Sequence, residues 1–238
     1  MDPEFWQTRW RENRIGFHEG RPNPLLVAHL PALGERRSVL VPLAGKAFDV
    51  LYLGALGHRV VAVELVEAAV QAFFAEHGIE PVLDQHGPFV RYRAGSLVFL
   101  AGDYFAATSE LLGPIDTVYD RAALIALPPA SRPRYLDHTR GLLLAGARET
   151  SRAPAALVIT FEYDERERTS PPPPHAVFED EVRAGYARDG LEVCLLADVD
   201  ALDDRQRAAG VTACREKAWL VGPVRCAPQA FDSSRQEA

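Results

Sequence analysis

The sequence predicts an α/β fold in which a mostly parallel sheet is covered by helices on both faces. Short, almost continuously apolar segments alternate with segments of helical periodicity along most of the 238 residues. Such apolar strands are typical of a parallel sheet that is buried on both sides. The last two strands are joined by a loop too short for a right-handed crossover, so one of them should be antiparallel. The seven expected strands are 38–43, 59–65, 96–105, 115–121, 155–164, 191–199 and 215–222.

The connections between these strands carry the helical signals. After the first strand, "AFDVLYLGAL" has helical spacing. "VEAAVQAFFAEHG" (66–78) repeats apolar residues at helical intervals and ends on Gly78, which can form a left-handed cap. Further helices are expected at 131–145 and 178–188. Segment 165–177 runs from charged residues into four prolines, so we expect it to be stiff and exposed.

Composition and charge indicate one globular domain and argue against nucleic acid as a partner. Hydrophobic residues make up 47% and charged residues 25% of the chain, which is ordinary for a single domain over 1–238. We divide it into a helical segment (1–35), a core (36–222) and a tail (223–238). The net charge of −7 and the lack of a basic stripe argue against nucleic acid. No signal peptide or membrane span is evident, so we expect a cytoplasmic protein. Nothing predicts a coiled coil or a swapped arm, so we expect a monomer.

The cysteines and histidines predict neither a disulfide framework nor a metal site. Cys194, Cys214 and Cys226 are odd in number and well separated, so we expect reduced thiols. None of the seven histidines forms an H-x-x-x-H pair or lies near a cysteine at metal-binding spacing.

Glu64 is the first candidate for a ligand contact. In open α/β sheets, ligands bind at the carboxyl ends of the strands, where the strand order reverses. Glu64 closes the second strand, 19 residues after Gly45. Nucleotide-binding folds place an acidic residue at about this spacing, where it accepts hydrogen bonds from the ribose hydroxyls. Two alternatives remain open from spacing alone: a chance occurrence, and a helix cap that faces solvent.

The loop after the first strand narrows the ligand class. A phosphate-binding loop needs several glycines, but "PLAGKAFD" offers only Gly45. Lys46 follows that glycine, yet the full G-x-x-x-x-G-K-[ST] motif is absent. The charge of nearby Asp49 should also repel a pyrophosphate. A nucleoside without phosphates therefore fits better, and S-adenosylmethionine, which joins a ribose to a sulfonium cation, is such a ligand.

Five separate strings make the chain resemble the thiopurine S-methyltransferases, especially their bacterial branch. The strings are "FWQTRWRENRIGFHEGRPNPLL", "VLVPLAGK", "LGHRVVAVEL", "AGDYF" and "YDRAALIALPP", in the family's order. The resemblance runs from residue 5 to about residue 222. It implies a Rossmann-like class I S-adenosylmethionine-dependent methyltransferase fold. The implied reaction moves a methyl group to sulfur or a similarly soft atom of a small acceptor, with S-adenosylhomocysteine as second product.

The resemblance also implies which residues contact the cofactor. By matching position, these are Trp10, Leu43, Glu64 and Arg121. An arginine after the fourth strand could hold the carboxylate of the methionine moiety through two parallel hydrogen bonds. The alternative for Arg121 is a catalytic one, in which it lies against an anionic acceptor and stabilises its thiolate.

Other implied contacts have structural alternatives. The resemblance makes the N-terminal segment a lid, with the Trp10 indole near the sulfonium, where a cation–π contact is favourable. Trp10 could instead be a core anchor, because it shares a helix face with Trp6. Asp103 and Tyr104 match the place where the family encloses the adenine, although Asp103 could be an ordinary turn residue. Leu43 could be both a core leucine and a cofactor contact.

The departures from the family concern the acceptor. Ala44 replaces the cysteine that usually precedes Gly45, and "PPPPHAV" places Pro174 and His175 where an aromatic pocket wall is expected. Thiopurines are therefore not assured as substrates. A thiol of low pKa, or a selenium or tellurium compound, would need no dedicated base. A nicotinamide-dependent oxidoreductase and a non-catalytic S-adenosylmethionine-binding protein remain as alternatives.

Overall fold

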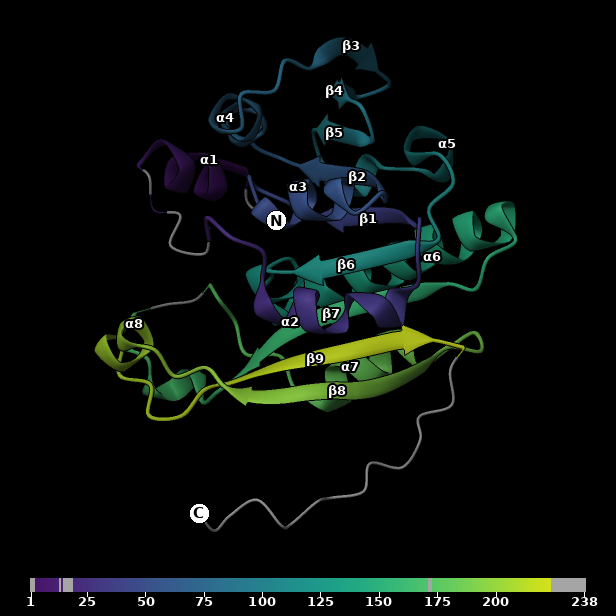
Figure 1. Ribbon diagram of the computed structural model, residues 1–238. Helices are drawn as coiled ribbons and strands as arrows, with labels where there is room; N and C mark the ends of the chain where they lie inside the picture. Colours follow the sequence, from purple (N-terminus) through teal and green to yellow (C-terminus); the bar gives the residue numbers. More distant parts are fainter. Residues whose placement is uncertain (1–2, 13, 15–18, 171–172, 224–238) are drawn as a thin grey trace.

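Nine strands form one sheet within the part of the chain that the computed structural model describes, residues 3–12, 14, 19–170 and 173–223. The strand order is β3-β4-β5-β2-β1-β6-β7-β9-β8, from top to bottom in Figure 1. The strands are β1 (Ser38–Pro42), β2 (Arg59–Glu64), β3 (Val82–His86), β4 (Phe89–Ala94), β5 (Leu97–Ala101), β6 (Thr117–Arg121), β7 (Ala155–Glu162), β8 (Glu192–Asp200) and β9 (Arg215–Gly222).

The seven strands predicted from the sequence form the continuous run from β5 to β8. Parallel pairing joins β5 to β2, β2 to β1, β1 to β6 and β6 to β7. β9 is antiparallel to both β7 and β8. The expectation of one antiparallel strand near the C-terminus is therefore confirmed, and β9 is that strand.

The prediction of seven strands is wrong by two, because β3 and β4 form an antiparallel hairpin on the β5 edge. Gly87 adopts a φ of +58° in its turn. The side chain of Val82 is 61% exposed, and β4 alternates apolar residues with Arg91 and Arg93. An edge hairpin with one solvated face lacks the continuous apolar run that marks a buried parallel strand.

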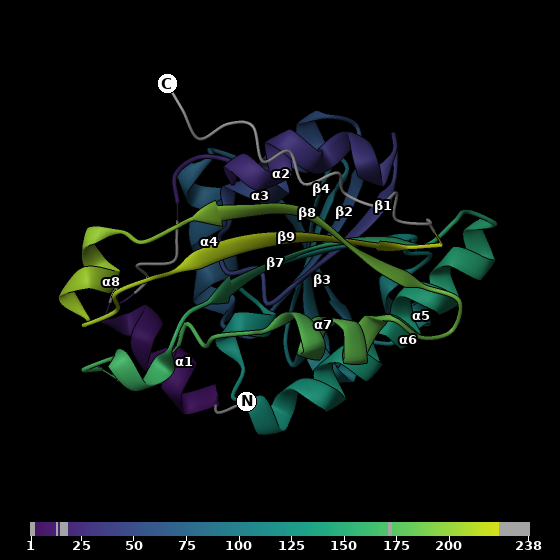
Figure 2. The ribbon, with the colours of Figure 1, turned by 90° about the horizontal axis from the view of Figure 1, so that it is seen from below.

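The helices lie on both faces of the sheet, as predicted. Figure 2 shows α2 and α3 on one face and α6 and α7 on the other. The two predicted segments 131–145 and 178–188 form α6, which continues to Thr150, and α7. The helices are α1 (Pro3–Arg11), α2 (Pro24–His29), α3 (Phe48–Ala55), α4 (Glu67–Glu76), α5 (Ser109–Leu112), α6 (Arg132–Thr150), α7 (Glu179–Tyr186) and α8 (Asp204–Ala208), with short 3₁₀ turns η1 (Leu30–Leu33), η2 (Tyr104–Ala106), η3 (Leu124–Ala126), η4 (Pro129–Ser131) and η5 (Glu165–Glu167).

The sheet separates two apolar cores. Leu40 of β1 packs in the core that α6 and α7 complete, whereas its neighbours Val39 and Val41 pack in the core under α2, α3 and α4. This alternation follows from the period of two in a strand. Because both faces are filled, the strand ends are the places left for a ligand.

The cysteine prediction is partly wrong. Cys194 is disulfide-bonded, whereas Cys214 is a free and buried thiol; Cys226 lies outside the described residues. In the described ranges, no helix has the length and apolar character needed to cross a bilayer. In the same ranges, no three His, Cys, Asp or Glu side chains are grouped to bind a metal.

Candidate active site

A cavity of about 520 Å³ lies at the carboxyl ends of β1, β2 and β6. Its volume is within the range of about 300–1,000 Å³ that small-molecule sites occupy. The strand ends supply Leu43, Glu64 and Arg121, which sequence reasoning placed in the site. In Figure 1 the same end of the sheet carries α1 and α8. Helix α1 contributes Trp6 and Arg9 to the lining.

Backbone strain is present on two sides of this cavity. Leu43, directly after β1, has a φ of +51°, and Ala122, directly after β6, has a φ of +65°. Residues other than glycine pay about 1–2 kcal/mol for this left-handed conformation. Both line the cavity, where such strain is commonly kept for function.

Glu64 is held by main-chain donors at the end of β2. Its carboxylate accepts hydrogen bonds from the N–H of Gly45 at 2.7 Å and from the N–H of Val66 at 2.8 Å. The residue is 6% exposed, and burial raises the pKa of its carboxyl, opposed by the hydrogen bonds from these amides. Each oxygen accepts one amide, so each keeps a further lone-pair direction for a ligand. The alternative of a solvent-facing cap does not agree with this burial.

The same contact explains why the loop suits a ligand without phosphates. The Gly45 N–H, the donor that a phosphate loop would offer, already binds Glu64. A second anion next to that carboxylate would be repelled.

Asp49 does not line the cavity, and its repulsion of a pyrophosphate stays a prediction. It is 2% exposed and accepts hydrogen bonds from the Asn23 N–H at 2.7 Å and the Tyr119 hydroxyl at 2.9 Å. It therefore anchors the chain before α2.

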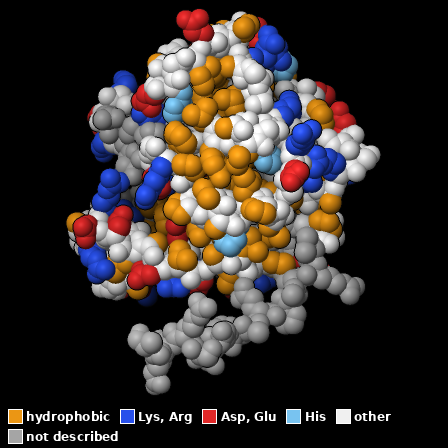
Figure 3. Space-filling model, viewed as in Figure 1, with side chains coloured by type: hydrophobic (Ala, Val, Ile, Leu, Met, Phe, Trp, Pro, Cys, Tyr) orange, Lys and Arg blue, Asp and Glu red, His pale blue; other side chains and the backbone are white. Residues whose placement is uncertain are grey.

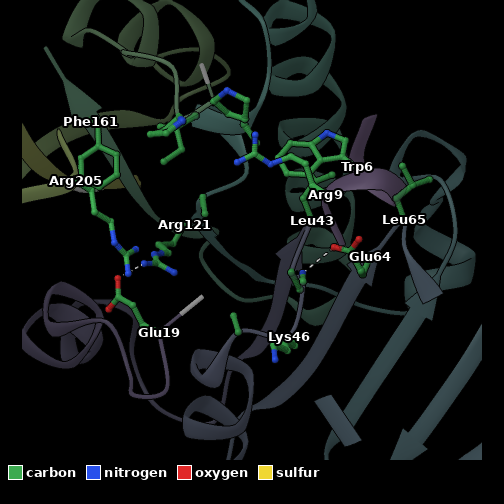
Figure 4. Close-up of a pocket in the computed structure, with 18 of the residues that line it drawn as sticks. Trp6, Arg9, Glu19, Leu43, Lys46, Glu64, Leu65, Arg121, Phe161 and Arg205 are labelled. Carbon is green, nitrogen blue, oxygen red and sulfur yellow. Dashed lines mark hydrogen bonds and ion pairs between the residues drawn. The ribbon is translucent and has the colours of Figure 1, made fainter. Parts of the chain in front are cut away.

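Arg121 ends β6 and forms an ion pair with Glu19. Figure 4 shows Arg121, Glu19 and Arg205 pointing toward one another at one end of the cavity, with Glu64 and Trp6 at the other. The preceding residue, Asp120, accepts hydrogen bonds from the Tyr135 hydroxyl at 2.8 Å and from the Leu124 N–H at 3.1 Å. Burial raises the pKa of Asp120 to about 6. Asp120 is thus part of the buried interior beneath the site.

Three residues expected at the cofactor are not part of the cavity lining. Trp10 is half-buried on α1, while its helix neighbours Trp6 and Arg9 line the cavity. Asp103 is exposed and caps η2 by accepting a hydrogen bond from the Phe105 N–H. Tyr104 is buried, and its hydroxyl lies 2.8 Å from that of Thr139. Their contacts with a cofactor remain a prediction.

Helices α1 and α8, strand β7 and two loops supply lining residues that sequence reasoning did not single out. They are Arg9, Glu19, Phe161, Arg168 and Arg205. The run of four prolines at 171–174 was the sequence signal for this part of the cavity, and Pro173 and Pro174 do line it. His175 does not, and residues 171–172 lie outside the described ranges.

Comparison with known proteins agrees with this geometry. The model of the thiopurine S-methyltransferase family matches residues 1–222. A thiopurine S-methyltransferase of Pseudomonas putida is 41% identical over 227 residues, covering 93% of this chain and 99% of the relative. Among solved structures, a Burkholderia thailandensis 1,6-didemethyltoxoflavin-N1-methyltransferase with bound S-adenosylhomocysteine matches with a TM-score of 0.60 and 17% identity over 94% of this chain and 87% of that one.

A second solved structure, a magnesium protoporphyrin IX methyltransferase from Synechocystis with bound S-adenosylhomocysteine, gives a TM-score of 0.55 at 14% identity and covers 90% of this chain and 93% of that one. At such low identity the two structures show the fold alone, which is the class I methyltransferase fold. The family match and the close relative go further, and the chain belongs to the thiopurine S-methyltransferase family.

Proposed function

We propose that this protein transfers the methyl group of S-adenosylmethionine to a small thiol or to another soft nucleophile such as a selenium or tellurium compound. Membership in the family makes the chain an S-adenosylmethionine-dependent methyltransferase. The observation that carries the proposal is Glu64, a buried carboxylate at the end of β2 whose two oxygens are each held by one backbone amide.

The residues present fit this cofactor. Glu64 can accept hydrogen bonds from both ribose hydroxyls while it keeps its bonds to Gly45 and Val66. Leu43 and Leu65 offer apolar contacts beside it. Arg121, at the other end of the cavity, suits the methionine carboxylate, since an arginine binds a carboxylate through two parallel hydrogen bonds. To make that contact, Arg121 would either release Glu19 or bind Glu19 and the methionine carboxylate together.

The chemistry needs alignment more than proton transfer. The cofactor supplies an activated methyl group on its sulfonium. The chain must hold the acceptor in line with it, about 3 Å away, and exclude water. Among the described residues that line the cavity there is no histidine, and Glu19, Glu64 and Asp203 are already engaged by Arg121 or by backbone amides. An acceptor that is already anionic at neutral pH, such as an acidic thiol, removes the need for a base.

Calorimetry with S-adenosylmethionine followed by a mass-spectrometric screen of acceptors tests the proposal. We expect cofactor binding and a methylated thiol, selenium or tellurium product together with S-adenosylhomocysteine. Tighter binding of NADH than of S-adenosylmethionine would instead indicate an oxidoreductase. Cofactor binding without turnover of any acceptor would indicate a non-catalytic binding protein.

The proposal includes a monomer that acts in the cytoplasm on a freely diffusing acceptor. The first part is checked by light scattering on the purified protein. A mass of about twice the 26.2 kDa of the chain would contradict it.

A further inference from the structure

The cavity is lined by more cations than anions. Lys and Arg side chains lie along the left edge of the molecule, between the positions of α1 and α8 (Figure 3). The basic lining residues are Arg9, Lys46, Arg121, Arg168 and Arg205, and the acidic ones are Glu19, Glu64 and Asp203. A cavity of one predominant charge attracts ligands of the other.

The acidic side chains already have partners. Glu64 accepts from two backbone amides, and Glu19 pairs with Arg121. Asp203 caps α8 by accepting from the Gln206 N–H at 2.7 Å. Lys46, on the basic side, pairs with Glu76 at 2.5 Å. Within the described residues, neither Arg9 nor Arg168 has an ion pair with a carboxylate.

Arg168 is held by neutral groups of its own loop. Its Nε donates to the Ser170 carbonyl at 3.1 Å. One terminal nitrogen donates to the Tyr163 hydroxyl at 3.3 Å and to the Pro174 carbonyl at 3.5 Å, and the other donates to the Ser170 hydroxyl at 3.3 Å. The guanidinium lies 5.7 Å from the Tyr163 ring centroid. These contacts fix the side chain without neutralising its charge, which therefore remains available to a ligand.

Arg9 presents a second guanidinium from α1. It lies 5.4 Å from the Phe5 ring and 6.0 Å from the Trp6 ring. Its Nε is buried and has no hydrogen-bond partner among the described residues. Burial lowers the pKa of Arg9, as do the charges of Arg14 and then Arg168. Two cations that repel each other across a cavity are stabilised by an anion that both can reach.

The loop of Arg168 is tied to the segment after α8. The Thr169 N–H donates to the Ala209 carbonyl at 2.8 Å, and the Thr212 N–H donates to the Glu167 carboxylate at 2.7 Å. A Cβ on Gly210 would lie 2.5 Å from the Glu167 carbonyl oxygen, so the two segments are in close contact. Arg168 therefore sits on a supported wall of the cavity and not on an isolated loop.

We propose, resting on the proposed function, that Arg9 and Arg168 bind a carboxylate of the methyl acceptor, so that the acceptor is a thiol carrying a carboxylate away from the sulfur. A planar carboxylate matches the donor geometry of a guanidinium, and two guanidiniums match its two oxygens. The two residues thereby set specificity, while the sulfur remains free to face the methyl group.

A matched pair of acceptors tests the assignment. 3-Mercaptobenzoate and 3-mercaptobenzamide have nearly the same shape and differ in the charge away from the sulfur. With the wild-type protein, we expect kcat/KM for the acid to exceed that for the amide by about tenfold or more, mainly through KM. Arg168→Gln should remove most of this preference and leave the amide within about twofold of wild type. Arg168→Lys keeps the charge but loses the paired N–H donors of the guanidinium. Its ratio of kcat/KM for the acid to kcat/KM for the amide should lie between those of the wild type and Arg168→Gln.

Arg166→Gln is the control, because Arg166 is exposed, bound to Asp164, and two residues away in the same loop. It should leave both acceptors unchanged. Calorimetry with benzoate gives a readout without turnover, and Arg168→Gln should weaken that binding by about tenfold.

The outcomes separate the two proposals. If the wild-type protein binds S-adenosylmethionine but methylates neither thiol, the proposed function fails for this acceptor class. If it methylates both thiols equally, or if Arg168→Gln slows both by the same factor, the function stands and the carboxylate assignment is overturned.

Discussion

The two sides of the cavity are built by different means. On the strand side, main-chain hydrogen bonds fix Glu64, and left-handed turns place Leu43 and Ala122. On the loop side, side chains of distant segments hold one another, as Glu167 does with Thr212. We therefore expect the strand side to determine the affinity for the cofactor and the loop side to determine the affinity for the acceptor. Substitutions on the two sides should then separate cofactor affinity from acceptor affinity.

The largest expected effect comes from Glu64→Ala. It would remove the two proposed contacts with the ribose, and it leaves the Gly45 and Val66 N–H groups without their acceptor. Calorimetry should show S-adenosylmethionine affinity lower by about 2 kcal/mol, or roughly 30-fold. Glu80→Ala, an exposed carboxylate beyond α4, is the control and should bind as wild type does. Unchanged affinity in Glu64→Ala would contradict the assignment of Glu64 to the ribose.

Arg121→Gln tests whether Arg121 binds the cofactor or the acceptor. If Arg121 holds the methionine carboxylate, the variant should bind S-adenosylmethionine about tenfold more weakly, with a smaller change in acceptor KM. The test compares cofactor affinity by calorimetry with acceptor KM from steady-state rates. A variant with normal cofactor affinity and a raised acceptor KM would move Arg121 to the acceptor, the alternative left open by its position.

The strand side could be predicted from sequence because its signals are local. An apolar run followed by a glycine, or by an acid at the right spacing, identifies a strand end directly. Leu43, Glu64 and Arg121 all come from such runs and all line the cavity. The β3–β4 hairpin could not be predicted in this way, since a strand pair at an exposed sheet edge needs no continuous apolar segment.

The loop side could not be predicted, because what places its residues is contact across long stretches of chain. Thr169 meets Ala209 across 40 residues, and Thr212 meets Glu167 across 45. Neither helical nor strand periodicity in the sequence predicts such long-range contacts. The same holds for α1, where four-residue spacing put Trp6 and Trp10 on one face but could not tell which of them, or Arg9, would reach the cavity.

Thr212→Val tests the loop side with a smaller effect. Valine keeps the N–H donor to Glu167 but removes the hydroxyl that lies 2.8 Å and 2.9 Å from its two oxygens. Losing about 1 kcal/mol of loop attachment should raise the acceptor KM by roughly fivefold at most and leave cofactor affinity unchanged. Thr150→Val, at the end of α6, is the control. A change in cofactor affinity equal to that in KM would show that the two sides are not independent.

The smallest expected effect is the pH dependence of cofactor affinity on the strand side. Burial raises the pKa of Glu64 above its ordinary value of 4.5. Ribose hydroxyls would donate to the ionised form, so the complex should have the lower pKa, and binding should release a proton in mildly acidic solution. Affinity should therefore be constant near neutrality and fall by roughly twofold to fivefold as the pH drops toward 4.5. Glu64→Gln, which cannot ionise at this position, should show a flatter profile, and an equally steep profile in that variant would assign the dependence to another group.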